Sequence, residues 1–258
     1  MRVTLPISTT RTREVVRHEL RLRSLTVVAV QPLTAHITRI TLAGDELEGF
    51  SSVGPEDHVK VLFPAPPGER ITRDYTPAVY RADARELDLD FVIHGDSGPA
   101  SRFASAATVG DVIGIGGPRG SRLAPSGYRR VVLLADETAV PALSRWIATT
   151  RWESEVIAFV QSEDPSILDY PFPTGDRVAL TAIGTGADAA LTALGGLHLD
   201  DDTYIWAAGE ATALIPVRRH LRRELGLDAT QVKVDGYWKL GTAELDHHAP
   251  LDPDDLDD

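Results

Sequence analysis

The segment Arg73-Asp74-Tyr75-Thr76-Pro77 combines side chains that could hold a phosphorylated aromatic ligand. An arginine can bridge a pyrophosphate, because its planar guanidinium presents a fork of hydrogen-bond donors. Two positions on, Tyr75 points to the same side of a strand and offers an aromatic face to a flat ring. The Thr76 hydroxyl could hydrogen-bond a ring nitrogen. An ordinary amphipathic strand ending at Pro77 would give the same pattern, so this segment alone leaves both interpretations open.

A glycine-rich segment further along could bind an anion at the start of a helix. It consists of His94, Gly95, Asp96, Ser97, Gly98, Pro99, Ala100 and Ser101. Pro99 suits the first helical position, because its missing N–H costs no hydrogen bond there. The free N–H groups of that terminus and the Ser101 hydroxyl would face a phosphate. A simple strand–turn–helix junction is an equally good interpretation.

A third loop closes the first half of the chain. Gly110-Asp111 forms a turn, and the run from Gly116 to Ser121 is a sharp reversal that contains Arg119. Arg119 could face a ligand or the solvent. The order and spacing of the three loops are more informative than any one of them.

Short strands must position these loops. The first half has strand candidates at 25–30, 36–42, 58–63, 71–75, 87–93 and 112–115, and one helix candidate at 99–107. Many short strands with frequent turn signals predict an antiparallel barrel or sandwich. The second half alternates strand candidates at 131–135, 156–160, 178–183 and 204–208 with helix candidates at 139–150, 187–194 and 211–225. This alternation predicts a parallel sheet with helices on its faces.

Composition excludes several classes of protein. The 258 residues include no cysteine, which excludes a disulfide framework and an iron–sulfur or cysteine-ligated metal centre. The net charge of −12 disfavours generic nucleic-acid binding. The arginine-rich N-terminus could still be a nucleic-acid arm, but we expect a solvated leader. No apolar run is long enough for a signal peptide or a membrane helix, so we expect a cytoplasmic protein without membrane insertion.

Taken in order, the three loops resemble those of the siderophore-interacting proteins, which are FAD-dependent ferric-siderophore reductases of the ferredoxin–NADP reductase superfamily. The resemblance continues through Asp136–Ala142, Ala208–Ala211 and Gly236–Gly241 and covers roughly residues 22–244. It implies a two-domain ferredoxin reductase-like fold, with an N-terminal antiparallel Greek-key β-barrel for FAD and an α/β parallel-sheet NAD(P)-binding domain. The expected boundaries are a flexible basic leader at 1–21, the FAD-binding barrel at 22–125, the NAD(P)H-binding domain at 126–245 and an acidic disordered tail at 246–258.

The resemblance also implies residue roles in FAD binding. Arg73 would hold the diphosphate, Tyr75 would stack on the isoalloxazine, and Thr76 would contact its N5 region. The phosphate loop would be Gly98, Pro99, Ala100 and Ser101, with His94 lying against the cofactor. Two positions depart from the family pattern: Ala78 replaces a common arginine, and Phe103 replaces a common tryptophan.

NADPH or NADH should bind the second half. The resemblance assigns the positioning of the nicotinamide to the loops that contain Asp136, Thr138, Gly209 and Glu210, with Tyr237 and Trp238 covering the flavin or contacting substrate. Helix capping explains the acid Asp136 equally well.

Two further patterns in the second half have weaker interpretations. A relaxed Gly-x-Gly-x-x-Ala pattern at 184–189 is interpreted as a plain turn, with a dinucleotide contact as the alternative. A set of arginines could recognise a 2′-phosphate, which favours NADPH, or could form a solvated helix face; its members are Arg218, Arg219, Arg222 and Arg223.

The expected substrate is a ferric siderophore, commonly anionic, which a positive rim would attract. The resemblance points to Lys60, Arg119 and Lys239 for this rim. We expect no metal site, since His247 and His248 lie in the acidic tail, and we expect a monomer that does not bind nucleic acid.

The predicted function is an NAD(P)H-dependent, FAD-containing ferric-siderophore reductase that releases iron as Fe(II) in the cytoplasm. The flavin carries the electrons, so no catalytic side chain is predicted. Two alternatives stay open: a general NAD(P)H:flavin or quinone reductase on the same fold, and a non-catalytic siderophore-binding protein.

Overall fold

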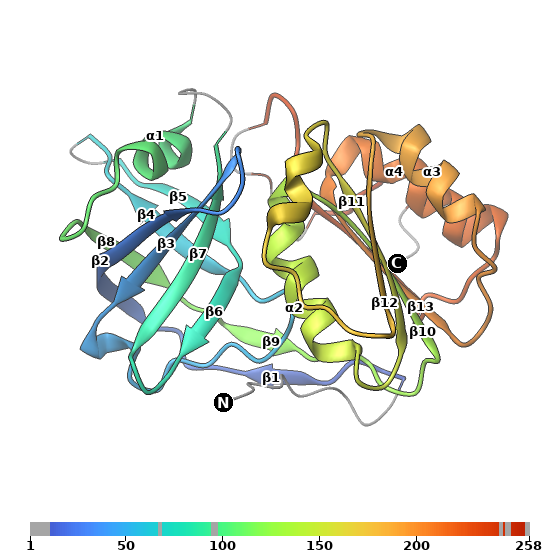
Figure 1. Ribbon diagram of the computed structural model, residues 1–258, viewed down its shortest axis with the longest axis horizontal. Coiled ribbons are helices and arrows are strands. Elements are labelled where there is room, and N and C mark those ends of the chain that lie inside the picture. The colour runs from blue at the N-terminus through green and yellow to red at the C-terminus, as the bar shows by residue number, and fades with distance from the viewer. Residues whose placement is uncertain (1–10, 67–68, 94–97, 243–244, 246–248, 256–258) are drawn as a thin grey trace. The chain divides into compact units, whose positions relative to one another are not determined.

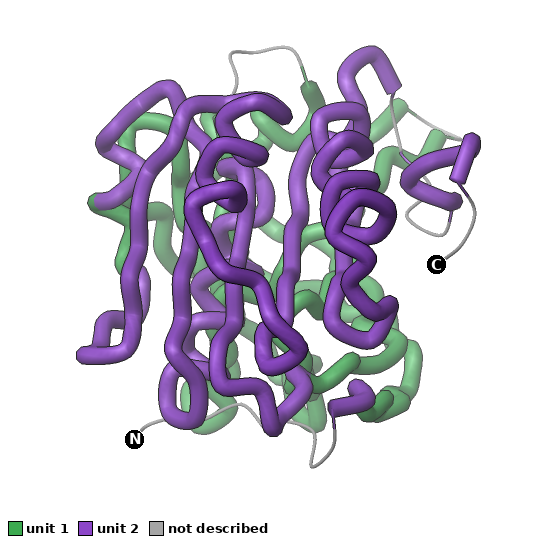
Figure 2. The backbone as a smooth tube through the Cα atoms, turned by 90° about the vertical axis from the view of Figure 1, so that its right-hand side faces the viewer, with its two compact units in different colours: residues 1–6, 14–123, 169–171 green, residues 7–13, 124–168, 172–258 purple. Residues whose placement is uncertain are grey.

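The computed structural model describes residues 11–66, 69–93, 98–242, 245 and 249–255. The chain forms two compact units (Figure 2). Unit 1 contains residues 14–123 and 169–171, and unit 2 contains residues 11–13, 124–168 and the chain from 172 onward. The short segment 169–171 thus belongs to unit 1 although its neighbours on both sides belong to unit 2.

Unit 1 is built on an antiparallel sheet of seven strands (Figure 1). In spatial order these are β5 (Ile71–Tyr75), β4 (Val59–Phe63), β8 (Val112–Gly116), β2 (Leu22–Pro32), β3 (Ile37–Ala43), β7 (Glu86–Val92) and β6 (Pro77–Arg81). Only Thr76 separates the edge strand β5 from the edge strand β6, so the sheet curls until its two edges come together at that residue. The predicted antiparallel barrel is confirmed as this curled sheet.

The strands of unit 1 have the two-residue alternation expected of a half-buried sheet. In β4, Val59, Val61 and Phe63 are buried in the core, whereas Lys60 is exposed. The short helices of this unit are η1 (Asp45–Leu47) and α1 (Pro99–Ala106), and α1 packs its Phe103 and Ala104 against the same core.

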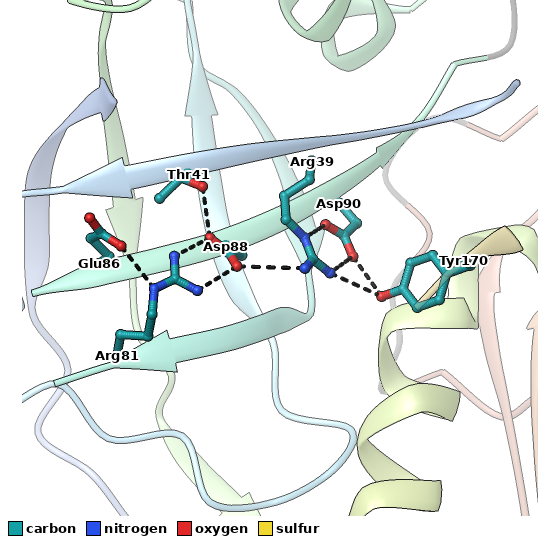
Figure 3. Close-up of polar contacts among 7 residues, drawn as sticks. All are labelled: Arg39, Thr41, Arg81, Glu86, Asp88, Asp90 and Tyr170. Atoms are coloured by element: carbon teal, nitrogen blue, oxygen red, sulfur yellow. Dashed lines mark hydrogen bonds and ion pairs between the residues drawn. The ribbon is translucent and has the colours of Figure 1, made fainter. Parts of the chain in front are cut away.

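A network of charged side chains lies on the other face of β3, β6 and β7 (Figure 3). Arg39 donates to both carboxylate oxygens of Asp90, at 2.7 and 2.8 Å. Arg81 donates to both oxygens of Asp88, at 2.7 and 2.6 Å. Tyr170, from the segment 169–171, donates its hydroxyl to Asp90 at 2.6 Å. Both buried carboxylates of this network are therefore matched by an arginine fork, which compensates their buried charge.

Unit 2 contains a parallel five-stranded sheet. Its strands, in spatial order, are β12 (Val178–Ile183), β11 (Glu155–Gln161), β10 (Arg130–Asp136), β13 (Thr203–Glu210) and β14 (Val232–Trp238). Its helices are η2 (Glu137–Ala139), α2 (Val140–Thr150), η3 (Pro165–Asp169), α3 (Ala187–Gly195), α4 (Ala211–Arg219) and the π-helical turn η4 (His220–Glu224). The predicted strand–helix alternation and parallel sheet are confirmed.

Helices cover both faces of this sheet (Figure 1). On one face, Trp146 of α2 stacks on Tyr204 with ring centroids 5.5 Å apart and lies 5.7 Å from Trp206. On the other face, residues of α3 and α4 pack against Val132 of β10 and Ile205 of β13. Ile205 stands between Tyr204 and Trp206 in the strand, so its side chain points to the opposite face of the sheet. Both faces of the sheet are therefore apolar, as in other doubly covered parallel sheets.

The expected flexible leader is corrected where the chain is described. The strand β1 (Val15–Arg17) pairs with β9 (Gly120–Arg122) in an antiparallel ladder. Ahead of it, Arg11 and Arg13 lie over the rings of Tyr128 and Trp146, at 4.9 and 5.0 Å from the ring centroids. Backbone pairing and cation–π contacts hold these residues, and neither signal is visible in their composition.

The expected disordered tail is also corrected for residues 249–255. Asp252 is buried and accepts from Arg219 Nε at 2.5 Å. Asp255 accepts from Arg223 Nε at 2.7 Å and from Arg218 at 3.1 Å. The acidic tail thus lies on the basic side of α4 and η4, because opposite charges that are remote in sequence meet there. Residues 246–248 and 256–258, including His247 and His248, lie outside the described residues.

None of the helices in the described residues is long and apolar enough to cross a membrane.

Candidate functional site

The candidate FAD residues Arg73 and Tyr75 share one face of β5. Arg73 lies opposite Val61 and Tyr75 opposite Val59 in the ladder with β4. Since Val59 and Val61 are both in the core, the two ligand candidates are on the core side of the sheet. Thr76 is buried at the junction of β5 and β6.

Tyr75 belongs to a cluster of aromatic rings that links β5 to α1. Its ring centroid lies 4.4 Å from that of Phe91 and 6.2 Å from that of Phe63. Phe103 of α1 contacts the same two rings, with centroids 6.0 and 5.7 Å away. Burial raises the pKa of Tyr75, against the opposing charge of Arg73, so its phenol stays protonated and can donate a hydrogen bond.

The start of α1 matches the predicted phosphate loop. Gly98 is the N-cap residue in an extended conformation, and Pro99 follows at the first helical position. Among the described residues, no side chain caps this terminus, and the first turn contains no acid. A Cβ added to Gly98 would meet nothing within 4 Å. The N–H groups of this first turn, which includes Ala100 and Ser101, therefore suit an anion.

These features fit FAD. An arginine, a half-buried tyrosine and a helix start that no described side chain caps lie around one aromatic cluster in unit 1, as a ring and a pyrophosphate require. His94 lies outside the described residues. The departure at Phe103 is accounted for, because its ring packs inside this cluster.

Two of the three substrate candidates lie near one another in unit 1. Lys60 pairs with Gly116 in the ladder between β4 and β8, and the exposed Arg119 follows three residues later. Lys60 Nζ contacts both carboxylate oxygens of Asp74, at 2.9 and 3.0 Å. The expected attraction of Lys60 for an anion is therefore reduced by its own partner. The exposed Lys239 belongs to unit 2, in the turn that the Thr242 N–H closes.

Ser121, at the end of the third loop, has a structural role. It donates to Asp57 at 2.5 Å and contacts His18 Nε2 at 2.7 Å. The serine stands between the acid and the histidine and is buried. A nucleophilic triad instead needs the histidine in the middle, to take the serine proton. The trio therefore ties the end of the loop to the preceding segments.

A pocket of about 110 Å³ lies at the carboxyl ends of the strands in unit 2. The strand order reverses between β10 and β13, which is where such sheets bind ligands. The pocket is lined by Asp136, Gln161, Thr185, Gly186, Glu210, Ala213, Leu214 and Trp238. The structure thus brings together three of the predicted residues, Asp136, Glu210 and Trp238.

Asp136 accepts three hydrogen bonds at this edge. Thr138 donates its N–H at 2.9 Å and its hydroxyl at 2.5 Å, and Trp238 donates its indole N–H at 2.7 Å. Burial raises the pKa of Asp136, while these hydrogen bonds oppose the rise. The capping interpretation of Asp136 is confirmed. Thr138 directs both its N–H and its hydroxyl to Asp136.

Gly209 allows the ends of β10 and β13 to approach. Its φ is +154°, and an added Cβ would lie 2.6 Å from Asp136 Oδ2. The next residue, Glu210, caps α4 by accepting from the Ala213 N–H at 2.7 Å. Its other oxygen accepts from the Leu240 N–H at 3.1 Å, which holds the turn after β14.

The predicted aromatic pair Tyr237-Trp238 has two environments. Tyr237 is half-buried, and its ring meets Trp206 edge-on with centroids 6.5 Å apart. Trp238 is 37% exposed and lies along the pocket with its indole directed to Asp136. Trp238 can therefore offer a ring to a ligand while its N–H stays fixed.

The pocket also contains Gln161, which the sequence analysis did not single out, and part of the 184–189 turn. Gln161 Nε2 donates to the carbonyl oxygens of Gly186 and Gly184, at 2.7 and 3.3 Å. Thr185 and Gly186 line the pocket, so the turn forms part of the pocket wall. The available signal was the position of this turn, which directly follows the strand neighbouring β11.

The described residues contain no group of three His, Asp or Glu side chains that could hold a metal ion. The arrangement offers one place for a flat ring with phosphates and a second place for a nucleotide at a sheet edge. Such a pair suits electron transfer from a pyridine nucleotide to a bound flavin.

Comparison with known proteins agrees with this geometry. The family model for the siderophore-interacting FAD-binding domain matches residues 26–71 and 67–122, and the model for siderophore-interacting protein matches residues 128–241. The NADPH-dependent ferric-chelate reductase of Escherichia coli K12 is 33% identical over 245 residues, which cover 86% of this chain and 95% of that protein.

Solved structures show the same fold. A siderophore utilization protein from T. fusca is 36% identical, with a TM-score of 0.81 over 92% of this chain and 100% of that one. The ferredoxin reductase of carbazole 1,9a-dioxygenase is 18% identical, with a TM-score of 0.67 over 85% of this chain and 70% of that one, and supports the fold alone. The chain has the predicted ferredoxin reductase-like fold and belongs to the siderophore-interacting protein family.

Proposed function

We propose that this chain is an NAD(P)H-dependent, FAD-containing reductase of ferric siderophores. The observation that carries the proposal is that one chain contains both half-sites, the start of α1 in unit 1 and the pocket in unit 2. Over 86% of its length, the same chain matches a relative named as an NADPH-dependent ferric-chelate reductase. In this proposal residues 22–125 hold FAD and residues 126–245 bind the nicotinamide coenzyme.

In unit 1, Arg73 and the start of α1 would hold the FAD diphosphate, and Tyr75 would hold the ring. Bound FAD supplies the conversion of a two-electron hydride into the single electrons that ferric iron accepts. The protonated Tyr75 phenol can donate a hydrogen bond to the cofactor, and Thr76 lies at the same end of β5. His94 stays a candidate contact.

In unit 2, the coenzyme would lie along the carboxyl ends of the strands. Asp136 and Glu210 use their oxygens to fix Trp238 and the turn at Leu240, so their main task is to shape the pocket. Gly209 leaves room for this arrangement. Tyr237 and Trp238 would orient the nicotinamide and exclude water from it.

The substrate would be a ferric chelate that carries negative charge. We assign the contact to Arg119, Lys60 and Lys239. Arg119 is exposed, whereas Lys60 shares its charge with Asp74, so we expect Arg119 to contribute more than Lys60. These side chains would raise the local concentration of an anionic chelate, an effect that salt screens.

The test is anaerobic. FAD-loaded protein is mixed with NADH or NADPH, a panel of ferric chelates is added, and Fe(II) is captured with a coloured chelator. Bleaching of the flavin followed by Fe(II) release supports the proposal. Bleaching without Fe(II) release would instead indicate a general flavin or quinone reductase. A colourless protein that takes up no FAD would indicate a siderophore-binding protein.

The assigned role of Tyr75 has its own test. Tyr75→Ala should weaken FAD binding by about 1–3 kcal/mol through lost stacking and burial. Tyr75→Phe is the matched control, because it keeps the ring and should retain most of the affinity. Fluorescence titration of the apoprotein with FAD measures both, and equal affinity in all three proteins would contradict the role.

We further propose that the protein acts as a monomer in the cytoplasm. Light scattering of the FAD-loaded protein tests its mass, and cell fractionation tests its location.

A further inference from the structure

Basic side chains are unevenly distributed between the two ends of the strands in unit 2, whereas acids lie at both ends, including Asp200 and Glu155 beside Arg129 and Arg130. Arginines gather at the amino ends of the strands, with Arg129 and Arg130 at the start of β10 and Arg177 before β12. Acids follow the carboxyl ends; they are Asp136, Glu137, Glu163, Asp164, Asp188 and Glu210. In the described part of unit 2, Lys239 is the one lysine or arginine that directly follows the carboxyl end of a strand.

The arginines of α4 and η4 are engaged elsewhere. Arg219 contacts Asp252, and Arg218 and Arg223 contact Asp255. The fourth member of this set, Arg222, donates to the Leu227 carbonyl oxygen. The sequence-based argument that these arginines favour NADPH is therefore not supported by their contacts.

Glu163 lies beside the pocket at the end of β11. It follows Gln161, the last residue of that strand, by two positions. Its Oε1 accepts from the Thr185 hydroxyl and from the Thr185 N–H at 3.3 Å. These hydrogen bonds lower the pKa of Glu163, so it is ionised at neutral pH. Within the described residues no donor contacts Oε2.

The proposed function determines which half of the coenzyme reaches Glu163. In that proposal Trp238, at the end of β14, orients the nicotinamide half, which would lie at β10 and β13. The adenosine half then extends the other way, over β11 and β12. In dinucleotide-binding α/β folds an acid near the end of the second strand accepts the ribose 2′-hydroxyl, whereas an arginine accommodates a 2′-phosphate. β11 is the second strand of this unit.

We propose that Glu163 accepts the adenosine 2′-hydroxyl and makes NADH the preferred reductant over NADPH. This inference rests on the proposed function. A 2′-phosphate would place additional negative charge beside Glu163 and Asp164, with no arginine from the described part of unit 2 at these strand ends. Thr185 holds the carboxylate in position.

Binding of coenzyme fragments tests the inference without turnover. FAD-loaded protein is titrated calorimetrically with ADP-ribose and with 2′-phospho-ADP-ribose. We expect ADP-ribose to bind at least tenfold more tightly, and Glu163→Gln to reduce that ratio at least threefold. Glu153→Gln is the matched control: it removes the same charge at the opposite edge of the sheet and should leave the ratio unchanged. Tighter binding of the 2′-phosphate, or an unchanged ratio in Glu163→Gln, overturns the inference.

Flavin reduction separates this inference from the proposed function. In anaerobic mixing at subsaturating coenzyme, NADH should bleach the flavin at least tenfold faster than NADPH. Faster bleaching by NADPH overturns the inference and leaves the reductase function intact. If neither coenzyme bleaches the flavin, the proposed function fails, and the fragment titration still decides whether Glu163 selects against a 2′-phosphate.

Discussion

Two sites, one in each unit, stabilise buried carboxylates in different ways. In unit 1, the buried Asp88 and Asp90 each receive an arginine fork (Figure 3). In unit 2, Asp136 receives only neutral donors, from Thr138, Trp238 and the backbone. The pKa values of the partners reflect this difference. Burial lowers the pKa of Arg39, but the hydrogen bond and charge of Asp90 outweigh it, so the net shift is upward.

The comparison distinguishes carboxylates that stay charged from a carboxylate whose charge depends on pH. An ion pair in low dielectric keeps both members charged, and removal of one member leaves the other uncompensated. Neutral donors stabilise a carboxylate less, so burial still raises the pKa of Asp136. The Asp88 and Asp90 network of unit 1 therefore holds strands together, whereas the pocket of unit 2 contains an acid whose charge depends on pH.

The largest expected effect comes from breaking the network of unit 1. Asp90→Ala removes the acceptor of two Arg39 hydrogen bonds and of one from the Tyr170 hydroxyl, and leaves Arg39 with Asp88 at 3.7 Å, so it should destabilise unit 1 by about 3–5 kcal/mol. Urea unfolding of the FAD-loaded protein measures this loss. Asp74→Ala, which removes the exposed pair with Lys60, is the control and should change the free energy of unfolding by less than about 0.5 kcal/mol. Equal losses of unfolding free energy in the two variants would show that the buried network stabilises the protein no more than an exposed ion pair does.

The next effect tests the close approach in unit 2. Gly209→Ala places a methyl group 2.6 Å from Asp136 Oδ2 and requires a strained φ. We expect a loss of about 1–3 kcal/mol in stability, as for other overpacked sites. Coenzyme binding should weaken as well, because Asp136 must move. Gly196→Ala, a helix-end glycine whose added Cβ would meet only a carbonyl oxygen at 3.6 Å, is the control. A fully stable Gly209→Ala protein would contradict the packing argument.

A smaller effect is expected from Trp238→Phe. The change removes one donor to Asp136 but keeps a ring over the pocket. We expect the free energy of unfolding to fall by about 1 kcal/mol at neutral pH. Hydrogen bonds to charged groups contribute more than this when they are fully buried, but Trp238 is partly exposed. The donor stabilises the ionised form, so the cost should shrink when Asp136 is protonated at low pH. Thermal unfolding at several pH values measures it, and a cost independent of pH would count against the bond.

The smallest effect is the titration of Asp136 itself. Because the folded-state pKa of Asp136 is raised, its contribution to stability is complete below the unfolded value of about 3.9 and is lost as pH rises through the folded value. Asp136→Asn removes this titration. The stability of the natural protein relative to the variant should therefore fall as pH rises from about 4. A difference that stays constant or grows with pH would show that neutral donors compensate the carboxylate fully.

Much of this protein could be predicted from local patterns. Period-two and buried-run strands, helical spacing and turn residues predict the curled antiparallel sheet and the parallel sheet, because backbone pairing and apolar burial depend on neighbouring residues. The loops at Arg73, Gly98, Asp136 and Gly209 could be recognised for the same reason, since each motif combines a turn with the side chains beside it.

Distances between remote residues were decided only by the tertiary structure. Lys60 meets Asp74 through the register of β4 and β5, and the acidic tail meets Arg219 through the packing of α4. The turn at Thr185 joins the pocket because β12 lies beside β11. Composition predicted free charges and a loose tail, because a sequence records how many charges a chain has. Whether a charge is paired depends on which segments the fold brings within hydrogen-bonding distance.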